Sequence, residues 1–199
     1  MVATTGARLL PSESLRALRA SILPLTTILT PNLPEAKLIL EDAGQGSFEV
    51  KDVDGLETIA RALQGLGPQW VLVKGGHIPF TENGAAAKTD NDKCIVVDVL
   101  AGPDTTLRFE SRFQGTRNTH GTGCSLACKS LESRVSRRET LTSSSAAIAS
   151  NLAKGLDVPK AVKAACQYIE AAIRTAPGFG QGSGPLNHFH STMILPFSP

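Results

Sequence analysis

The sequence predicts an α/β fold, in which helices pack on the faces of a β-sheet. Short β-prone runs alternate along the chain with segments of helical spacing, and this alternation is typical of the class. Trp70-Val71-Leu72-Val73 has the continuous apolar character of a buried strand, whereas residues 158–175 have helical spacing throughout. Hydrophobic residues make up 41% of the 199 residues and charged residues 19%, so the chain can form a buried core.

The first part of the chain is predicted to contain a helix, a strand and a second helix. An amphipathic helix over residues 11–23 presents its apolar side chains on one face: Leu15, Leu18 and Ile22. Residues 26–30 are β-prone and are followed by Pro31, which stops the strand. A helix is predicted over residues 32–40, and Pro34 does not oppose it because proline is tolerated in a first turn.

The middle of the chain is predicted to contain a loop, a helix and three strands. The loop over residues 44–51 precedes a helix that opens at Asp54, with Glu57 at the spacing of a capping box, and ends near Gly65. The buried strand over residues 70–73 follows. Two further strands, joined by a Gly-Pro turn, cover residues 93–100 and 106–110.

The rest of the chain is predicted to be mostly helical from Cys124 onward, with the clearest helix over residues 158–175. The tail over residues 177–199 is rich in glycine and proline and has no regular pattern. The chain shows no internal repeat. We therefore expect residues 1–199 to belong to one domain.

Charge and cysteine content exclude several classes of protein. The 20 basic and 18 acidic residues give a net charge of +2, which favours neither nucleic acid nor a membrane surface as a partner. The four cysteines form no CxxC pair and no zinc-like group with histidine. No segment is apolar over the length of a bilayer and no secretory leader is visible, so we expect a reducing, cytoplasmic location.

Three loops follow predicted strands and lead toward helices. In α/β sheets, ligands bind beyond the carboxyl ends of the strands, which is where such loops lie. These loops are residues 30–32, 74–77 and 120–124.

The third loop is a candidate phosphate site. Gly121, Thr122 and Gly123 precede a predicted helix, and the two glycines allow several backbone N–H groups to converge on an anion at the helix N-terminus. Cys124 stands directly beside this cradle, and its thiolate is favoured at a helix N-terminus. The alternative is a tight strand-to-helix connection with a buried, inert cysteine.

The first loop is a candidate magnesium site. Asn32 and Glu35 are three residues apart at the start of a helix, so an amide and a carboxylate share one face. The alternative is helix capping by Asn32, with Glu35 completing the box, and taken alone this is the favoured interpretation.

The second loop places Lys74 after a buried strand and before Gly75 and Gly76. A lysine there can reach a transferring phosphate as a point charge, while the glycines let the backbone approach the ligand. The alternative is a surface lysine at a turn.

The order of these three loops resembles hydroxymethylpyrimidine/phosphomethylpyrimidine kinase, a thiamine-pathway member of the ribokinase-like superfamily. The resemblance extends to residues 178–188 near the C-terminus and covers nearly the whole chain. It is carried by Thr30-Pro31-Asn32-Leu33-Pro34-Glu35-Ala36, Val73-Lys74-Gly75-Gly76-His77 and His120-Gly121-Thr122-Gly123-Cys124. It implies the ribokinase-like three-layer α/β/α sandwich, of which this chain would form the C-terminal portion only.

The resemblance also implies an activity: ATP-dependent phosphorylation of hydroxymethylpyrimidine and then of its monophosphate, an aminopyrimidine alcohol being the small-molecule substrate. Lys74, Gly75 and Gly76, with Thr30 and Asn32, would meet the nucleotide, and Asn32 and Glu35 would support Mg²⁺. Residues 121–123 would form the anion hole, with Cys124 as the base at the substrate hydroxyl. Family members commonly pair, so a homodimer is also an expectation.

The chain departs from the family pattern in two places. It begins partway through the family's sheet, without the portion that carries a glycine-rich substrate loop. Residues 128–144 are polar and basic and interrupt the helix that would otherwise run from Ala127 into Ser145. They fit either a translated intron, which we favour, or a surface insertion. For both reasons we expect activity to be impaired.

Three other functions stay open. Cysteine-bearing relatives accept pyridoxal-type rings, so a pyridoxal or pyridoxamine kinase is one alternative. A non-catalytic nucleotide-binding fragment that needs a partner is another. A cysteine-nucleophile hydrolase ranks last, because no persuasive Cys–His–Asx arrangement is present.

Overall fold

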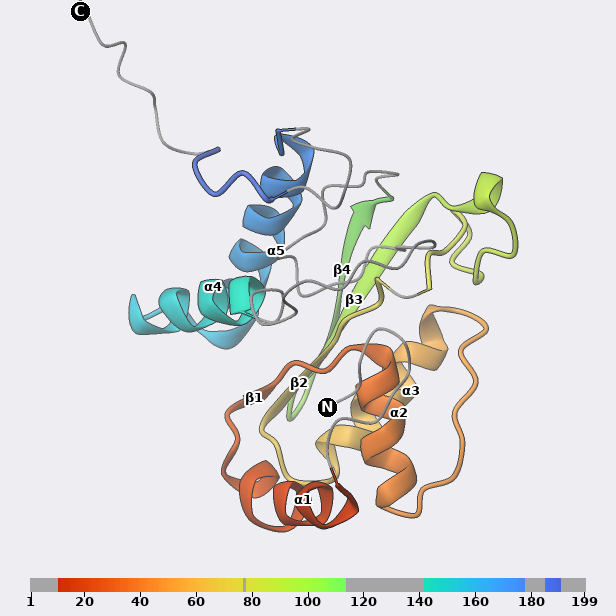
Figure 1. Ribbon diagram of the computed structural model, residues 1–199, viewed down its shortest axis with the longest axis vertical. Helices are drawn as coiled ribbons and strands as arrows, with labels where there is room; N and C mark the ends of the chain where they lie inside the picture. The colour runs from red at the N-terminus through yellow and green to blue at the C-terminus, as the bar shows by residue number, and fades with distance from the viewer. Residues whose placement is uncertain (1–10, 77, 114–141, 178–184, 191–199) are drawn as a thin grey trace, which may run out of the picture.

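The computed structural model describes residues 11–76, 78–113, 142–177 and 185–190, and within these residues a four-stranded sheet carries helices on both faces (Figure 1). The strands lie in the order β1-β2-β3-β4. β1 and β2 are parallel, whereas β2–β3 and β3–β4 are antiparallel. The strands are β1 (Ile28–Leu29), β2 (Trp70–Val73), β3 (Ile95–Ala101) and β4 (Thr106–Arg112).

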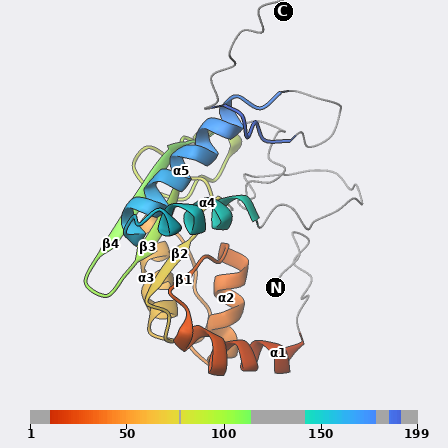
Figure 2. The same cartoon turned by 90° about the vertical axis from the view of Figure 1, so that its left-hand side faces the viewer.

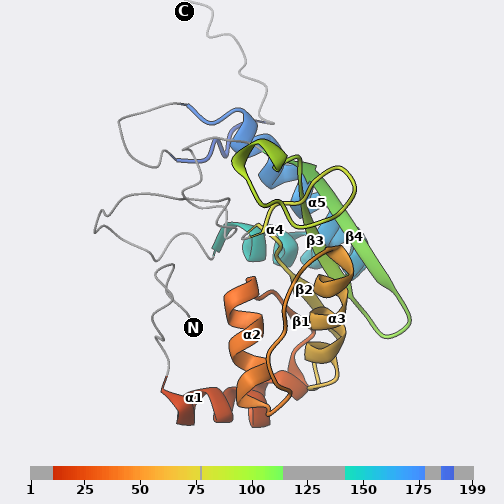
Figure 3. The ribbon, with the colours of Figure 1, turned by 90° about the vertical axis from the view of Figure 1, so that its right-hand side faces the viewer.

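The helices divide between the two faces of the sheet, which gives three layers. On one face lie α1 (Ser12–Ala17), α2 (Leu33–Asp42) and α3 (Val53–Gln64), with α2 beside α3 (Figure 3). On the other lie α4 (Thr142–Ala153) and α5 (Val158–Arg174), with α5 along β3 and β4 (Figure 2). The predicted α/β class is confirmed, and no helix in the described ranges is long and apolar enough to cross a membrane.

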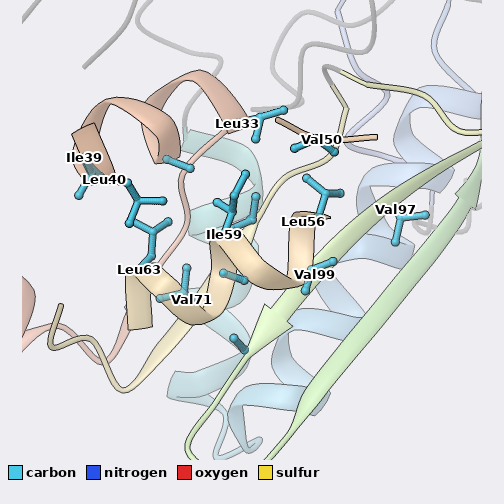
Figure 4. Packing of buried hydrophobic residues seen from close by; sticks show 14 of the residues in the cluster. Leu33, Ile39, Leu40, Val50, Leu56, Ile59, Leu63, Val71, Val97 and Val99 are labelled. Atoms are coloured by element: carbon cyan, nitrogen blue, oxygen red, sulfur yellow. The ribbon is translucent and has the colours of Figure 1, made fainter. Parts of the chain in front are cut away.

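Alternation along the strands supplies a separate core on each face. Val71 and Val73 pack with α2 and α3, whereas Leu72 between them packs with α4 and α5. α3 covers its face of the sheet with a stripe of buried residues (Figure 4), among them Leu56, Ile59 and Leu63.

The predicted helix over residues 11–23 is correct for its first part only. After α1 the chain forms a π-turn, η1 (Leu18–Ile22), and then a 3₁₀ turn, η2 (Leu23–Leu25). The wider π-turn rotates the residues that follow it. Leu15 is buried in α1 and Leu23 is buried directly after the π-turn, whereas Ile22, expected on the apolar face, is 53% exposed.

The N-cap of α3 lies two residues earlier than predicted. Asp52, rather than Asp54, is the N-cap, and its Oδ1 accepts from Gly55 N–H at 2.9 Å. Asp54 and Glu57 instead accept from the Arg108 guanidinium on β4, each at 2.6 Å. This exposed pair of contacts joins α3 to β4 and raises the pKa of Arg108.

The remaining elements agree with the predicted types. The turn between β3 and β4 contains Gly102, whose missing side chain leaves room for the Trp70 ring: a Cβ there would lie 2.1 Å from it. Beyond η3 (Asp90–Asp92) and the hairpin, the description resumes at α4. The first residues of α4, 142–144, belong to the predicted interruption over residues 128–144, and the rest of that segment lies outside the described residues.

Candidate active site

The first two predicted loops meet where β1 and β2 end. Asn32 pairs with Lys74 in a parallel bridge, and Lys74 N–H donates to the Pro31 carbonyl at 3.0 Å. Thr30 lies at the same edge, where its hydroxyl is 3.2 Å from the Ser145 hydroxyl near the start of α4. Parallel pairing of β1 and β2 brings their carboxyl ends to one edge, so segments more than forty residues apart become neighbours.

Asn32 and Glu35 form the complete capping box of α2. Asn32 Oδ1 accepts from Glu35 N–H at 2.9 Å, and Glu35 Oε2 accepts from Asn32 N–H at 3.1 Å. The capping interpretation is therefore confirmed. Glu35 is also only 5% exposed, so it is held in the protein interior. There it contacts Asn32, which in turn pairs with Lys74.

Lys74 is 3% exposed, which contradicts the alternative of a surface lysine at a turn. It follows Leu72 by two positions and so faces α4 and α5. There it lines a cavity of about 260 Å³ between the sheet and these two helices, together with Asp98, Ser144, Cys166 and Glu170. A buried lysine is unusual without an electrostatic or ligand-binding reason.

Gly75 is held against β3. A Cβ at this position would lie 1.9 Å from the Val97 carbonyl oxygen and 3.2 Å from Leu56 Cδ1, so no larger residue fits. Gly75 thus lets the end of β2 approach β3. That it also lets the backbone approach a ligand stays a prediction. Gly76 is buried as well.

Asp98 is a site residue that we did not predict. Its Oδ1 accepts from Gly75 N–H at 2.9 Å, and Cys166 Sγ donates to its Oδ2 at 4.0 Å. Burial raises the pKa of Asp98 to about 6, against the opposing effects of the Gly75 N–H and the Lys74 ammonium. The sequence feature that could have pointed to Asp98 is its position as the single carboxylate within the apolar run of Ile95–Ala101.

Several predicted residues lie outside the described residues: His77, His120, Gly121, Thr122, Gly123 and Cys124. Within the described ranges, no group of three or more His, Cys, Asp or Glu side chains could hold a metal ion. Any metal at Asn32 and Glu35 would therefore draw on amide, carboxylate and non-protein ligands.

Comparisons with known proteins match nearly the whole chain. The family model described as phosphomethylpyrimidine kinase matches residues 1–143 and 132–187. The hydroxymethylpyrimidine/phosphomethylpyrimidine kinase of Rhizobium meliloti is 38% identical over 192 residues, which are 96% of this chain and 59% of that protein. A putative kinase of the same name, numbered 2, from Schizosaccharomyces pombe is 34% identical over 200 residues, which span all of this chain and 33% of that protein.

Solved structures of two kinases also match this chain. An ADP complex of Bacillus subtilis pyridoxal kinase matches with a TM-score of 0.65 and 32% identity, over 92% of this chain and 57% of that one. The phosphomethylpyrimidine kinase of Clostridium difficile matches with a TM-score of 0.57 and 27% identity, over 87% and 54%. The expected fold family is confirmed. The chain spans less than two thirds of the length of each of these relatives.

The raised pKa of Asp98 predicts how stability depends on pH. Between about pH 4 and pH 6 the folded state retains a proton that the unfolded state has lost, so the free energy of unfolding falls as the pH rises through this window. The fall is roughly 3 kcal/mol at about 1.4 kcal/mol per pKa unit, and it ends above pH 6. Asp98→Asn removes it.

Urea unfolding followed by the fluorescence of Trp70, the one tryptophan, measures this at pH 4, 5, 6 and 7. Asp104→Asn, in the exposed turn after β3, is the control. A difference between Asp98→Asn and wild type that does not change with pH would show that the carboxyl titrates alike in both states.

The packing of Gly75 predicts a second effect. Gly75→Ala forces the Val97 backbone to move and should destabilise the fold by about 1–3 kcal/mol, as overpacking does. Gly65→Ala, whose Cβ would meet its nearest atom at 3.4 Å, should leave stability unchanged or raise it by up to about 1 kcal/mol. Equal unfolding midpoints for the two variants in urea would contradict the close approach of Gly75 to β3.

Proposed function

The chain belongs to the phosphomethylpyrimidine kinase family, and on that premise we propose that it binds ATP where β1 and β2 end. The activity that it serves is the transfer of the γ-phosphoryl group to hydroxymethylpyrimidine and to its monophosphate, in thiamine biosynthesis. The observation that carries this proposal is the buried ammonium of Lys74 beside the Asn32 loop.

Lys74 has the position that a phosphate-binding lysine needs. Phosphoryl transfer depends mainly on positioning and on neutralising the charge that spreads over the phosphoryl oxygens. A cation held in a partly enclosed cavity is less screened by water than one on the surface, so it interacts more strongly with a phosphate. The cavity extends from Lys74 along α5, and its end beside Lys74 is where we place the phosphates.

Asn32 and Glu35 fit a hydrated Mg²⁺ although they cap α2. An amide oxygen and a carboxylate each have more lone pairs than a single capping bond requires, so capping does not prevent either group from also facing a cation. The buried carboxylate of Glu35 is also a group that a nearby cation would stabilise. When bound, Mg²⁺ would neutralise phosphate oxygens, while these two residues orient it directly or through water.

The anion hole proposed at Gly121, Thr122 and Gly123, with Cys124 as the base, depends on how the chain enters α4. The contact between Thr30 and Ser145 places the start of α4 at the edge that carries Asn32. Without residues 128–144, Ala127 would join Ser145, and Cys124 would enter the first turn of α4 directly after the glycine loop. The family model matches in two overlapping stretches rather than one, which supports an interruption here.

A pyridoxal-type acceptor is the second candidate. It is favoured by the 32% identity to Bacillus subtilis pyridoxal kinase. Parallel assays of hydroxymethylpyrimidine and pyridoxal with ATP and Mg²⁺ distinguish the two acceptors. ATP binding without transfer to either one would support a nucleotide-binding module instead.

We predict that Lys74→Met weakens ATP binding about 10- to 100-fold and leaves adenosine binding unchanged, because a charged hydrogen bond to phosphate contributes roughly 1.5–3 kcal/mol. Titration calorimetry of both ligands measures this. Lys160→Met is the control, since Lys160 is exposed in the first turn of α5 and does not line the cavity. Equal ATP affinity in wild type and Lys74→Met would reject Lys74 as a phosphate ligand.

Deletion of residues 128–144 is predicted to strengthen ATP binding at least about 10-fold, because it places the backbone N–H groups of residues 121–123 at the start of α4. A Gly/Ser linker of the same length in place of residues 128–144 is the matched control, since it keeps the interruption. The anion-hole assignment fails if the deletion and the linker variant bind ATP equally.

A further inference from the structure

Lys74 and Asp98 face each other across two neighbouring strands. The antiparallel register pairs Val71 with Ala101 and Val73 with Val99, so the next position along places Lys74 opposite Asp98. Both side chains lie on the sheet face that α5 covers, and both line the cavity of about 260 Å³.

Where β2 ends, the Asp98 side chain replaces a backbone carbonyl as the hydrogen-bond acceptor. The register pairs of β2 and β3 stop at Val73, and the N–H of Gly75 instead donates to the Asp98 carboxylate at 2.9 Å. Because Gly75 is buried, this N–H would lose a hydrogen bond without a protein acceptor there. The second carboxylate oxygen accepts from the Cys166 thiol on α5, so Asp98 is bonded both within the sheet and to the helix that covers it.

The backbone that carries Lys74 is thereby fixed at three places. Lys74 N–H is bound to the Pro31 carbonyl on one side. On the other side Gly75 abuts the Val97 carbonyl and donates to Asp98. Of these contacts, the Asp98 bond is the one made by a side chain, and a substitution can remove it without altering the strands.

We propose that Asp98 is a positioning residue for phosphate binding, because its carboxylate holds the Gly75 N–H and so sets the backbone from which Lys74 reaches the ligand. The proposal rests on the proposed function, since phosphate is taken as the ligand of Lys74. Asp98 itself is proposed to touch neither the nucleotide nor the acceptor. Its effect is confined to the phosphate part of the nucleotide.

Two substitutions test whether the accepting oxygen of Asp98 is the feature that matters. Asp98→Asn keeps an oxygen that accepts from Gly75 N–H, whereas Asp98→Ala removes it. We expect Asp98→Ala to lower ATP affinity about 10-fold with adenosine affinity unchanged, and Asp98→Asn to stay within about threefold of wild type for both ligands. Asp104→Ala, in the exposed turn after β3, is the control, and Trp70 fluorescence verifies that each variant is folded.

A purely structural role would give a different result. In that case Asp98→Ala would lower stability while the ratio of ATP to adenosine affinity stayed at the wild-type value, and this would overturn the proposal. A loss in Asp98→Asn as large as that in Asp98→Ala would also overturn it, because the Gly75 bond would then not be the cause.

Hydrogen exchange of the unliganded protein separates this proposal from the proposed function. We expect the Gly75 amide to exchange faster in Asp98→Ala than in wild type and at the wild-type rate in Asp98→Asn. Failure of the folded wild-type chain to bind ATP would reject the proposed function, whereas unchanged exchange at Gly75 in Asp98→Ala would reject the role of Asp98 whether or not ATP binds.

Discussion

The end of β2 is confined between two neighbouring segments, and the candidate site depends on this confinement. On one side Lys74 bonds to the Pro31 carbonyl and pairs with Asn32. On the other side Gly75 lies against β3 so closely that no side chain fits. A lysine that follows a freely extending strand would point into water. Here the backbone has no such freedom, and Lys74 is kept 3% exposed at the wall of a cavity.

The sequence predicted the elements well where a local pattern determines them. The stripe of α3 and the continuous apolar run of β2 required no knowledge of the neighbours, and both were confirmed. The errors arose where distant segments decide. Asp54 and Glu57 fit a capping box by spacing alone, yet Arg108 of β4 binds both, and Asp52 caps the helix instead. The π-turn that exposes Ile22 has no signal that spacing could reveal.

The candidate site was predictable in the same uneven way. Capping by Asn32 and Glu35 is a local arrangement and was expected. The meeting of Asn32 with Lys74 follows from the parallel pairing of their strands, which the α/β class implied. Asp98 was missed because its partner Gly75 is brought to it by the register of β2 and β3, which no stretch of sequence displays. The roles of residues 121–124 stay predictions, because these residues lie outside the described part of the chain.

We propose that the phosphates of ATP meet Lys74 at the edge of the sheet that also carries Asn32. The most direct measurement is a crystal structure of the chain with a non-hydrolysable ATP analogue and Mg²⁺. We predict a phosphate oxygen within hydrogen-bond distance of Lys74 Nζ, with Gly75 still bonded to Asp98. A nucleotide seated on another surface, with the cavity beside Lys74 filled by solvent alone, would contradict it.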